Sequence, residues 1–424
     1  MEQPLTRNIR PDRPPLDLKA YEEADGYQAV RKALQGMTPE QVVAAVKQAD
    51  LRGRGGAGFP TGVKWSLVPM GPDAPRPRYL VANADEMEPG TFKDRLLLEG
   101  DPHQLLEGMI IAAYAIGAEV AFIFLRSEYT LAAERLERAI AEAYQAGYLG
   151  SNILGTGFSL EMYLHRSAGR YICGEETALL NALEGKRAIP RFKPPFPQVN
   201  GLWGKPTIVN NVETLCNVPH IIYNGADWYC NQSYSRDGGT KLYGVSGRVV
   251  RPGTWEMPMG TPLREVLEGR AGGMLPGYKL RGLLPGGGST DFLVEEHLDV
   301  KLDFESVQKA GSRMGTGTII VLDDHTCPVG FVLNLVKFFA QESCGWCTPC
   351  REGLPWLTQI LAAMEAGRGR PGDIEILERH TVLLGPGRTF CALAPGAVEP
   401  LQSALKYFRD DFERHIRERR CPWR

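Results

Sequence analysis

Three cysteines, each separated by two residues, stand in the stretch Glu342-Ser343-Cys344-Gly345-Trp346-Cys347-Thr348-Pro349-Cys350. A fourth cysteine, Cys391, follows 41 positions beyond Cys350. Three closely spaced thiolates and one remote thiolate are typical of a chain that binds a cubane iron–sulfur cluster. A structural zinc ion more often takes its ligands as two separate pairs, although spacing alone does not exclude zinc. We therefore expect a [4Fe-4S] cluster on Cys344, Cys347, Cys350 and Cys391.

The other five cysteines show no such spacing. Nine cysteines in 424 residues are too few for a disulfide-rich protein, and no apolar stretch of a signal peptide leads the chain. We therefore expect a reducing compartment, in which clustered cysteines are more often metal ligands than disulfides. Small buried side chains or exposed thiols are expected for Cys173, Cys216, Cys230, Cys327 and Cys421. Because an iron–sulfur cluster moves single electrons, we expect a two-electron cofactor elsewhere in the chain.

Length and pattern predict several domains, since 424 residues exceed one ordinary core. The net charge of −2 gives no indication of nucleic-acid binding. We predict a polar and then helical segment (1–50), an α/β domain (51–236), a small mixed β module (240–325) and a helical bundle with the cluster (328–424). Within the last two parts we expect a hairpin over 242–250, a short helix over 261–268, and helices over 329–341, 354–366, 371–384 and 395–420.

The most apolar segment is 105–125, but Glu107 and Glu119 lie in it and Gly117 divides it. It therefore favours a buried helix followed by a strand over 120–125 rather than a membrane span. Any membrane association is expected to come through a partner.

A glycine-rich loop occupies Leu51-Arg52-Gly53-Arg54-Gly55-Gly56-Ala57-Gly58-Phe59-Pro60-Thr61-Gly62-Val63-Lys64-Trp65. Glycines let backbone amides approach an anion together, and Lys64 adds a positive charge for phosphate. Phe59 and Trp65 offer faces on which a ring could stack. The loop matches G-x-G-x-x-G, but it follows a helix (39–47) rather than the strand of a standard dinucleotide fold. A plain surface turn is the alternative.

Acids and amides follow several short apolar runs. Asn83 and Asp85 follow an expected strand (79–82), where they suit the polar edge of a flavin ring or the cap of the next helix. Glu175 and Glu176 follow a second run; a carboxylate there could accept both ribose hydroxyls and repel a 2′-phosphate, which favours NADH over NADPH. Further polar and aromatic candidates for phosphate, ribitol or base are Asn210, Asn211, Thr214, Lys193 and Phe196.

These segments contain no serine or histidine in a nucleophile–base arrangement, which argues against hydrolysis. Hydride transfer requires no protein acid or base, only two rings held face to face.

Six segments together resemble the NADH-binding flavoprotein subunit family of respiratory complex I, the NADH:quinone oxidoreductase of bacteria and mitochondria. They span nearly the whole chain and occur in the order of the family. They are Gly53–Gly62, Asn83–Thr91, Tyr171–Thr177, Lys205–Thr214, Glu342–Cys350 and Gly387–Cys391.

The resemblance implies a Rossmann-like FMN domain, a ubiquitin-like β-grasp module and a C-terminal four-helix bundle. It implies that FMN is bound by Gly53, Arg54, Gly55, Gly56, Ala57, Gly58, Lys64, Asn83, Asp85, Tyr171, Gly174, Glu175, Asn210, Asn211 and Thr214. It implies that NADH is bound by Phe59, Glu88, Glu176, Lys193 and Phe196, with Glu88 and Glu176 positioning the nucleotide and no catalytic side chain. Whether Glu175 or Glu176 faces the ribose is an assignment taken from the resemblance alone.

The implied function is oxidation of NADH by FMN, with electrons passing singly to the [4Fe-4S] cluster and on toward quinone. Implied partners are the other peripheral-arm subunits, especially a thioredoxin-like [2Fe-2S] subunit and a large iron–sulfur subunit, on the cytoplasmic side of the inner membrane. The nearest alternative is the diaphorase subunit of an NAD-linked hydrogenase or formate dehydrogenase. No ferredoxin-like cysteine octet follows Cys391 and no thioredoxin-like domain precedes Gly53, which favours complex I. A zinc-stabilised non-enzymatic module is the alternative from another class.

Overall fold

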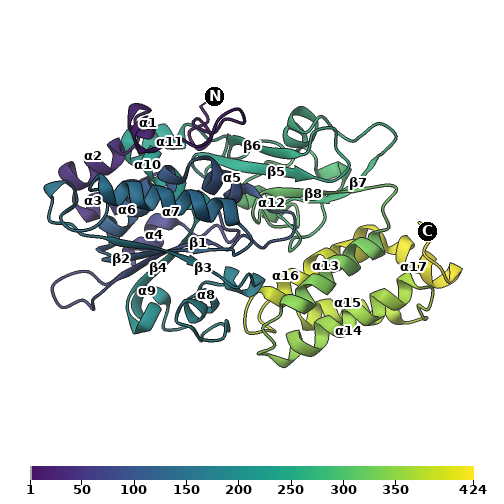
Figure 1. The fold of residues 1–424 in the computed structure, drawn as a ribbon. Helices are drawn as coiled ribbons and strands as arrows, with labels where there is room; N and C mark the ends of the chain where they lie inside the picture. The colour runs from purple at the N-terminus through teal and green to yellow at the C-terminus, as the bar shows by residue number, and fades with distance from the viewer. Residues whose placement is uncertain (1) are drawn as a thin grey trace. The chain divides into compact units, whose positions relative to one another are not determined.

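The computed structural model describes residues 2–424, which divide into two compact units. The first unit comprises residues 2–87, Phe92–Leu242 and Glu256–Gly260; the second comprises Glu88–Thr91, Tyr243–Trp255 and Thr261–Arg424 (Figure 1). Within residues 2–424, no helix combines the length and apolar character that crossing a bilayer requires.

The first unit is built on a parallel sheet with the strand order β3-β2-β1-β4. The strands are β1 (Tyr79–Ala84), β2 (Val120–Leu125), β3 (Glu161–Arg166) and β4 (Thr207–Asn211). Helices α6 and α7 lie on one face and α8 and α9 on the other (Figure 1). The chain continues from β1 to β2 and β3 on one side and returns to place β4 on the other. The carboxyl ends of β1 and β4 therefore form a topological switch point, where open α/β sheets bind ligands.

The expected Rossmann-like α/β class is confirmed. The helices of the first unit are α1 (Leu18–Glu23), α2 (Gln28–Gly36), α3 (Pro39–Gln48), α4 (Thr61–Ser66), α5 (Lys93–Gly100), α6 (Pro102–Ile116), α7 (Thr130–Gln145), α8 (Glu176–Leu183), α9 (Pro197–Asn200), α10 (Val212–Asn224) and α11 (Ala226–Cys230). The apolar segment 105–125 is a buried helix and a strand, as expected. Gly117, at φ 63°, ends α6 in the left-handed conformation that glycine adopts without strain.

Glu107 on α6 provides a pH-dependent contribution to stability. Its carboxylate accepts hydrogen bonds from the Tyr21 hydroxyl at 2.7 Å and the Ala29 N–H at 3.1 Å. Burial nevertheless raises its pKa from 4.5 to about 7. Because the raised pKa belongs to the folded state, the contribution of Glu107 to the unfolding free energy is present below pH 4.5. It is lost as the pH rises through 7, by on the order of 3 kcal/mol.

Urea unfolding of Glu107→Gln at pH 5 and pH 8 should show a smaller loss of unfolding free energy with pH than the parent protein shows. An equal loss in the two proteins would contradict this assignment.

A second sheet has the order β6-β5-β8-β7. Its strands are β5 (Thr240–Ser246), β6 (Gly253–Pro258), β7 (Leu280–Leu284) and β8 (Thr318–Asp323), with β5 parallel and β7 antiparallel to β8. A π-helical turn (Glu265–Arg270) and α12 (Phe304–Lys309) accompany it. This mixed sheet agrees with the expected β-grasp class. The hairpin expected over 242–250 is wrong in its second strand, which begins at Gly253, because Val249 makes only an isolated bridge to Met274.

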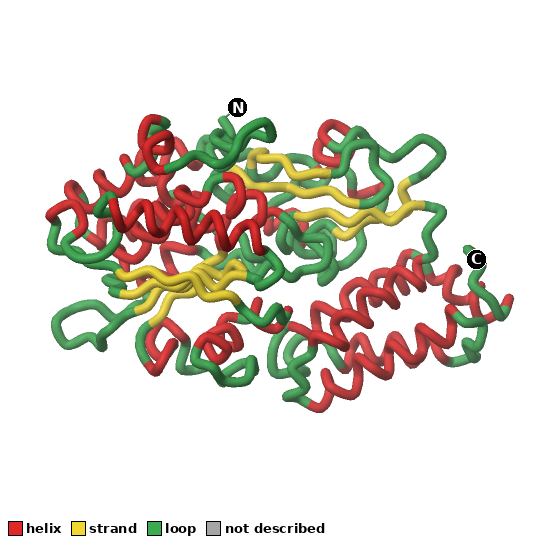
Figure 2. The backbone as a smooth tube through the Cα atoms, viewed as in Figure 1, coloured by secondary structure: helices red, strands yellow, loops and turns green. Residues whose placement is uncertain are grey.

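The C-terminal part of the second unit is a helical bundle, in agreement with the expected fold class. Its helices are α13 (Pro328–Glu342), α14 (Thr348–Glu365), α15 (Asp373–Leu383), α16 (Leu393–Tyr407) and α17 (Arg409–Glu418), drawn in red in Figure 2. The single helix expected over 395–420 is interrupted at Phe408, whose ring is buried edge-on against Phe292.

Candidate active site and iron–sulfur centre

The glycine loop connects α3 to α4 and closes on itself. The Gly53 N–H donates to the Phe59 carbonyl at 2.9 Å, and the Thr61 N–H donates to the Leu51 carbonyl at 2.8 Å. A Cβ at Gly55 would lie 3.1 Å from the Cβ of Asn211, so the loop backbone lies directly against the end of β4. Gly56, Ala57 and Gly58 continue the same loop. The loop is therefore held at the carboxyl edge of the sheet, beside the switch point.

The polar residues expected at this edge are brought together. Asn83 on β1 is the register partner of Asn211 on β4. The Asn83 amide donates to the carbonyl of Gly174 at 3.4 Å, in the 3₁₀ turn Tyr171–Gly174. Asp85 is buried and accepts a hydrogen bond from the Ser167 hydroxyl at 3.0 Å. Amides, a carboxylate and a turn from three separate segments thus share one end of the sheet.

The side chains after β4 connect the glycine loop to α10. The side-chain oxygen Oδ1 of Asn210 accepts the indole N–H of Trp65 at 2.8 Å, and the Thr214 hydroxyl accepts the backbone N–H of Arg54 at 2.8 Å. Trp65 is only 1% exposed, so the expectation that it offers a stacking face is wrong: its ring belongs to the core. Phe59 is 51% exposed and does present an accessible face.

Arg54 contributes its backbone rather than its side chain to this edge. Its guanidinium is buried and donates to the carbonyls of Gly238 at 2.8 Å and Thr240 at 3.1 Å. The Arg54 guanidinium therefore stabilises the packing of the first unit. A ligand bound at the glycine loop would contact the backbone of Arg54 instead of its side chain.

Glu176 lies between two lysines. Its carboxylate is 2.7 Å from Lys64 Nζ and 3.3 Å from Lys193 Nζ. Burial opposes its ionisation, but the two ammonium groups outweigh this effect and lower its pKa. The same carboxylate raises the pKa of Lys193, together with Glu175 and against the effect of burial. The Glu176 carboxylate is therefore ionised at neutral pH.

Glu175 has a different role from its neighbour. One of its carboxylate oxygens accepts the N–H groups of Thr177 at 2.9 Å and Ala178 at 2.8 Å, which caps the N-terminus of α8. Its other oxygen accepts a hydrogen bond from Lys193 at 2.9 Å.

Two further expected nucleotide residues are Glu88 and Phe196. Glu88 belongs to the second unit, where its carboxylate accepts the Ser289 N–H at 2.7 Å. Phe196 is 53% exposed at the start of α9, so a face of its ring is accessible.

A buried ionic network lies under this edge and was not predicted. Lys93 Nζ is 2.7 Å from both Asp94 and Glu213, and Lys241 Nζ is 3.1 Å from Glu213. Burial disfavours the Glu213 carboxylate, but Lys241 and Lys93 outweigh it and lower its pKa to about 2. Asp94 also accepts the Asn211 amide at 2.6 Å, so the network fixes a residue of the candidate site. The only sequence signal was the position of Glu213 two residues after Asn211.

The four expected cluster cysteines lie at the ends of three bundle helices. Cys344 follows α13, Cys347 and Cys350 begin α14, and Cys391 precedes α16. Burial raises the pKa of Cys350 to about 12, and the nearby thiolates of Cys347, Cys391 and Cys344 add to the shift. Because α13 packs against both α14 and α16, four cysteines at the ends of these helices fit the thiolate donor set of a cubane cluster.

Three protein-family models match the chain. "Nuo51 FMN-binding domain" matches residues 46–220, "SLBB domain" matches 242–292, and "NADH-ubiquinone oxidoreductase-F iron-sulfur binding region" matches 330–415. The F subunit of the NADH-quinone oxidoreductase of Salmonella typhimurium (strain LT2) is 60% identical over 98% of this chain and 93% of its own length. The corresponding protein of Escherichia coli (strain K12) shows the same identity and coverage.

A solved structure also resembles the chain at lower identity. A chain of an NAD+-reducing [NiFe]-hydrogenase, in the air-oxidized state, matches with a TM-score of 0.82 and 37% identity. The match covers 95% of this chain and 67% of that chain.

Proposed function

Because the chain belongs to the family of NADH-quinone oxidoreductase F subunits, we propose which of its residues hold the nucleotide and the flavin. The chain is the NADH-oxidising subunit of a multi-subunit complex I, with FMN, a [4Fe-4S] cluster and NADH as substrate. When bound, FMN accepts a hydride from NADH and the cluster carries the electrons singly toward quinone.

For the flavin, we propose the glycine loop 53–58 with Lys64, Asn83, Asp85, Tyr171, Gly174, Glu175, Asn210, Asn211 and Thr214. The register pairing of Asn83 with Asn211 supports this, because it brings two amides to the switch point. The contact of Gly55 with Asn211 supports the same assignment for the loop. Lys64, 2.7 Å from the Val209 carbonyl, provides a positive charge at this edge.

For NADH, we propose Glu176 as the ribose-binding carboxylate, with Phe59, Lys193 and Phe196 of the first unit as further contacts. The expected role of Glu88 stays a prediction. The observation that carries this choice is the difference between the contacts of the Glu175 and Glu176 carboxylates. One oxygen of Glu175 already caps α8, whereas the carboxylate of Glu176 lies between Lys64 and Lys193. A carboxylate in this position accepts ribose hydroxyls and repels a 2′-phosphate.

Replacing Glu176 by glutamine should raise activity with NADPH relative to NADH. The substitution removes a negative charge and leaves the ammonium groups of Lys64 and Lys193 free to attract the 2′-phosphate. We expect the NADPH/NADH ratio of kcat/KM to rise by roughly tenfold, which corresponds to about 1.4 kcal/mol. Ferricyanide reduction by the purified protein measures both values.

Glu137→Gln, an exposed substitution on α7, is the matched control and should leave the ratio unchanged. An unchanged ratio in Glu176→Gln, with bound flavin retained, would show that another residue discriminates between the two nucleotides.

We further propose the partners and the location. The intermediate exposure of Cys344, Cys347 and Cys391, next to Trp346 at 53% exposure, supports a surface through which a partner iron–sulfur subunit approaches the cluster. A thioredoxin-like [2Fe-2S] subunit and a large iron–sulfur subunit are the proposed partners, on the cytoplasmic side of the inner membrane. The domain boundaries 51–236, 240–325 and 328–424 stay a prediction. Limited proteolysis, which cleaves preferentially between domains, tests them.

A diaphorase role is the second candidate, since the hydrogenase chain matches most of this one. The identity of 60% to the Salmonella typhimurium protein, against 37% to the hydrogenase chain, favours complex I. The subunits that copurify with the chain from its native host distinguish the two: a hydrogenase subunit would establish the diaphorase role.

A further inference from the structure

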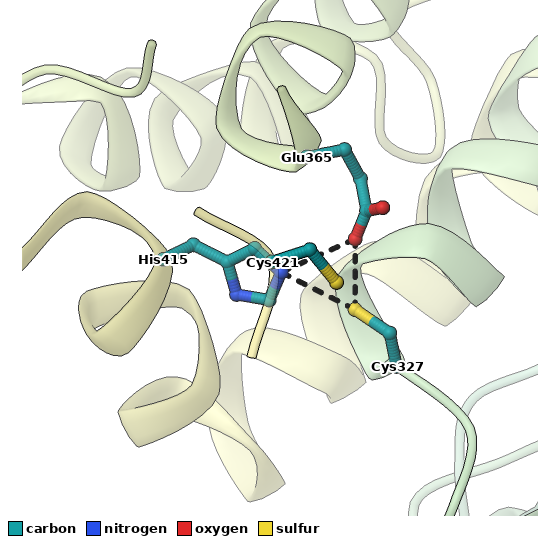
Figure 3. A group of neighbouring side chains, drawn as sticks. All are labelled: Cys327, Glu365, His415 and Cys421. Carbon is teal, nitrogen blue, oxygen red and sulfur yellow. Dashed lines mark hydrogen bonds and ion pairs between the residues drawn. The ribbon is translucent and has the colours of Figure 1, made fainter. Parts of the chain in front are cut away.

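Four side chains with metal-binding atoms meet in the bundle, away from the cluster cysteines in sequence. Cys327 precedes α13, Glu365 ends α14, His415 lies on α17, and Cys421 follows α17 (Figure 3). One ligand atom from each residue lies within 4.8 Å of the others. All four residues are buried, with His415 completely so. Their pattern in the sequence led us to expect only packing for the two cysteines, and that expectation misses this convergence.

The distances suit a single small cation. Cys327 Sγ is 2.8 Å from Glu365 Oε1 and 3.3 Å from His415 Nε2, and these last two atoms are 3.2 Å apart. In a tetrahedral zinc site, bonds of 2.0 to 2.3 Å place neighbouring ligand atoms about 3.3 to 3.8 Å apart. The Cys327–Glu365 pair must therefore separate by roughly 0.7 Å, and the two pairs with His415 need much smaller shifts, to reach the size of a zinc site.

The surroundings orient the donors inward. His415 Nδ1 lies 2.6 Å from the Asp411 carbonyl, which can only accept, so Nδ1 carries the proton and the Nε2 lone pair faces the other ligands. The Gly330 N–H donates to Cys327 Sγ at 3.3 Å at the N-terminus of α13, which fixes the position of this sulfur. The second carboxylate oxygen of Glu365, Oε2, accepts no hydrogen bond of good geometry, but it forms an ion pair with the Arg424 guanidinium at 3.4 Å. Such second contacts are typical of built metal sites.

We propose that Cys327, Glu365, His415 and Cys421 bind one structural zinc ion. Two sulfurs, one nitrogen and one oxygen are ligands that zinc accepts, and four protein ligands leave no open position for catalysis. Two thiolates and a carboxylate with one zinc ion leave one negative charge, and the exposed Arg424 guanidinium lies 3.4 Å from Glu365, where it partly offsets that charge.

The position of the proposed zinc site indicates a structural role, in which the ion links the ends of two bundle helices. The proposed zinc ligand Cys327 directly precedes α13, which ends two residues before Cys344. Cys347 directly precedes α14, which ends at the proposed zinc ligand Glu365. The zinc ion would therefore join the two ends of this helix pair that are remote from the iron–sulfur cysteines. It would also fix α17 and the segment that carries Cys421. The inference does not depend on the proposed function.

The full-length chain, purified with its flavin and cluster and without a histidine tag, is the sample for the test. Elemental analysis should find about one zinc and about four irons per chain. Zinc-edge X-ray absorption, which needs no variant, should show two sulfurs at about 2.3 Å and two nitrogen or oxygen atoms at about 2.0 Å. Cys421→Ser should lose most of the zinc and keep the iron. Cys230→Ser, a cysteine outside both groups, should keep both metals.

Three results would overturn the proposal. The first is parent protein that stays free of zinc after incubation with a zinc salt. The second is a zinc shell of four sulfurs, which would place zinc on the cluster cysteines. The third is a protein mass lower by two hydrogen atoms, together with a peptide in which Cys327 and Cys421 are linked. This result would show that the two cysteines form a disulfide.

Discussion

Replacement of Cys391 by serine is expected to abolish the iron–sulfur cluster, lowering bound iron from about four atoms per chain to nearly none. Cys391 is the remote ligand: the other three sulfurs come from one short loop and the start of α14. Three thiolates leave one corner of a cubane without its protein ligand. Iron and sulfide assays on the purified variant measure the loss.

The flavin should remain in this variant, because its proposed ligands lie in the first unit and Cys391 lies in the second. Flavin absorbance on the same sample tests this point, and Cys230→Ser provides the matched cysteine control. Retention of four irons would contradict the assignment of Cys391. Loss of both cofactors would mean that the cluster supports the fold of the whole chain.

Replacement of Glu213 by glutamine is expected to destabilise the first unit by about 3–5 kcal/mol, the cost of breaking a buried ion pair on one side. The carboxylate is fully buried between Lys93 and Lys241, and it also accepts the Leu242 N–H at 2.9 Å. Glutamine keeps the shape but leaves Lys241 without its charged partner. Urea unfolding at pH 7, followed by circular dichroism, measures the change.

Glu137→Gln on the exposed face of α7 should change the unfolding free energy by less than about 0.5 kcal/mol. A change below about 1 kcal/mol for Glu213→Gln would show that the network contributes little to stability. The variant should also bind flavin more weakly, because Asp94 in the same network holds the Asn211 amide.

Local patterns explain what the sequence predicted well. Thr38 and Gln41 form the capping box that begins α3, and Gly117 ends α6, so both boundaries follow from neighbouring residues. Asn83 follows an expected strand (79–82), and the resemblance implies that Asn83 and Asn211 both bind the flavin. Parallel strands bring their carboxyl ends to one edge, and the register confirms that these residues are neighbours.

Burial and distant convergence explain what the sequence did not reveal. Trp65 was expected at a surface, yet its indole N–H bonds Asn210 inside the core. In the sequence, Lys93 and Lys241 cannot be distinguished from solvated lysines. Only the fold buries them beside Glu213. Cys327 and Cys421 are 94 positions apart, so no spacing rule links them. Only tertiary packing brings such groups together.

An anaerobic absorption spectrum of the purified protein, before and after addition of NADH, tests the central claim most directly. The account predicts a flavin band that bleaches on addition of NADH, in a sample with about four irons and four sulfides per chain. A colourless protein, or a flavin band that NADH leaves unchanged while the flavin stays bound, would contradict it.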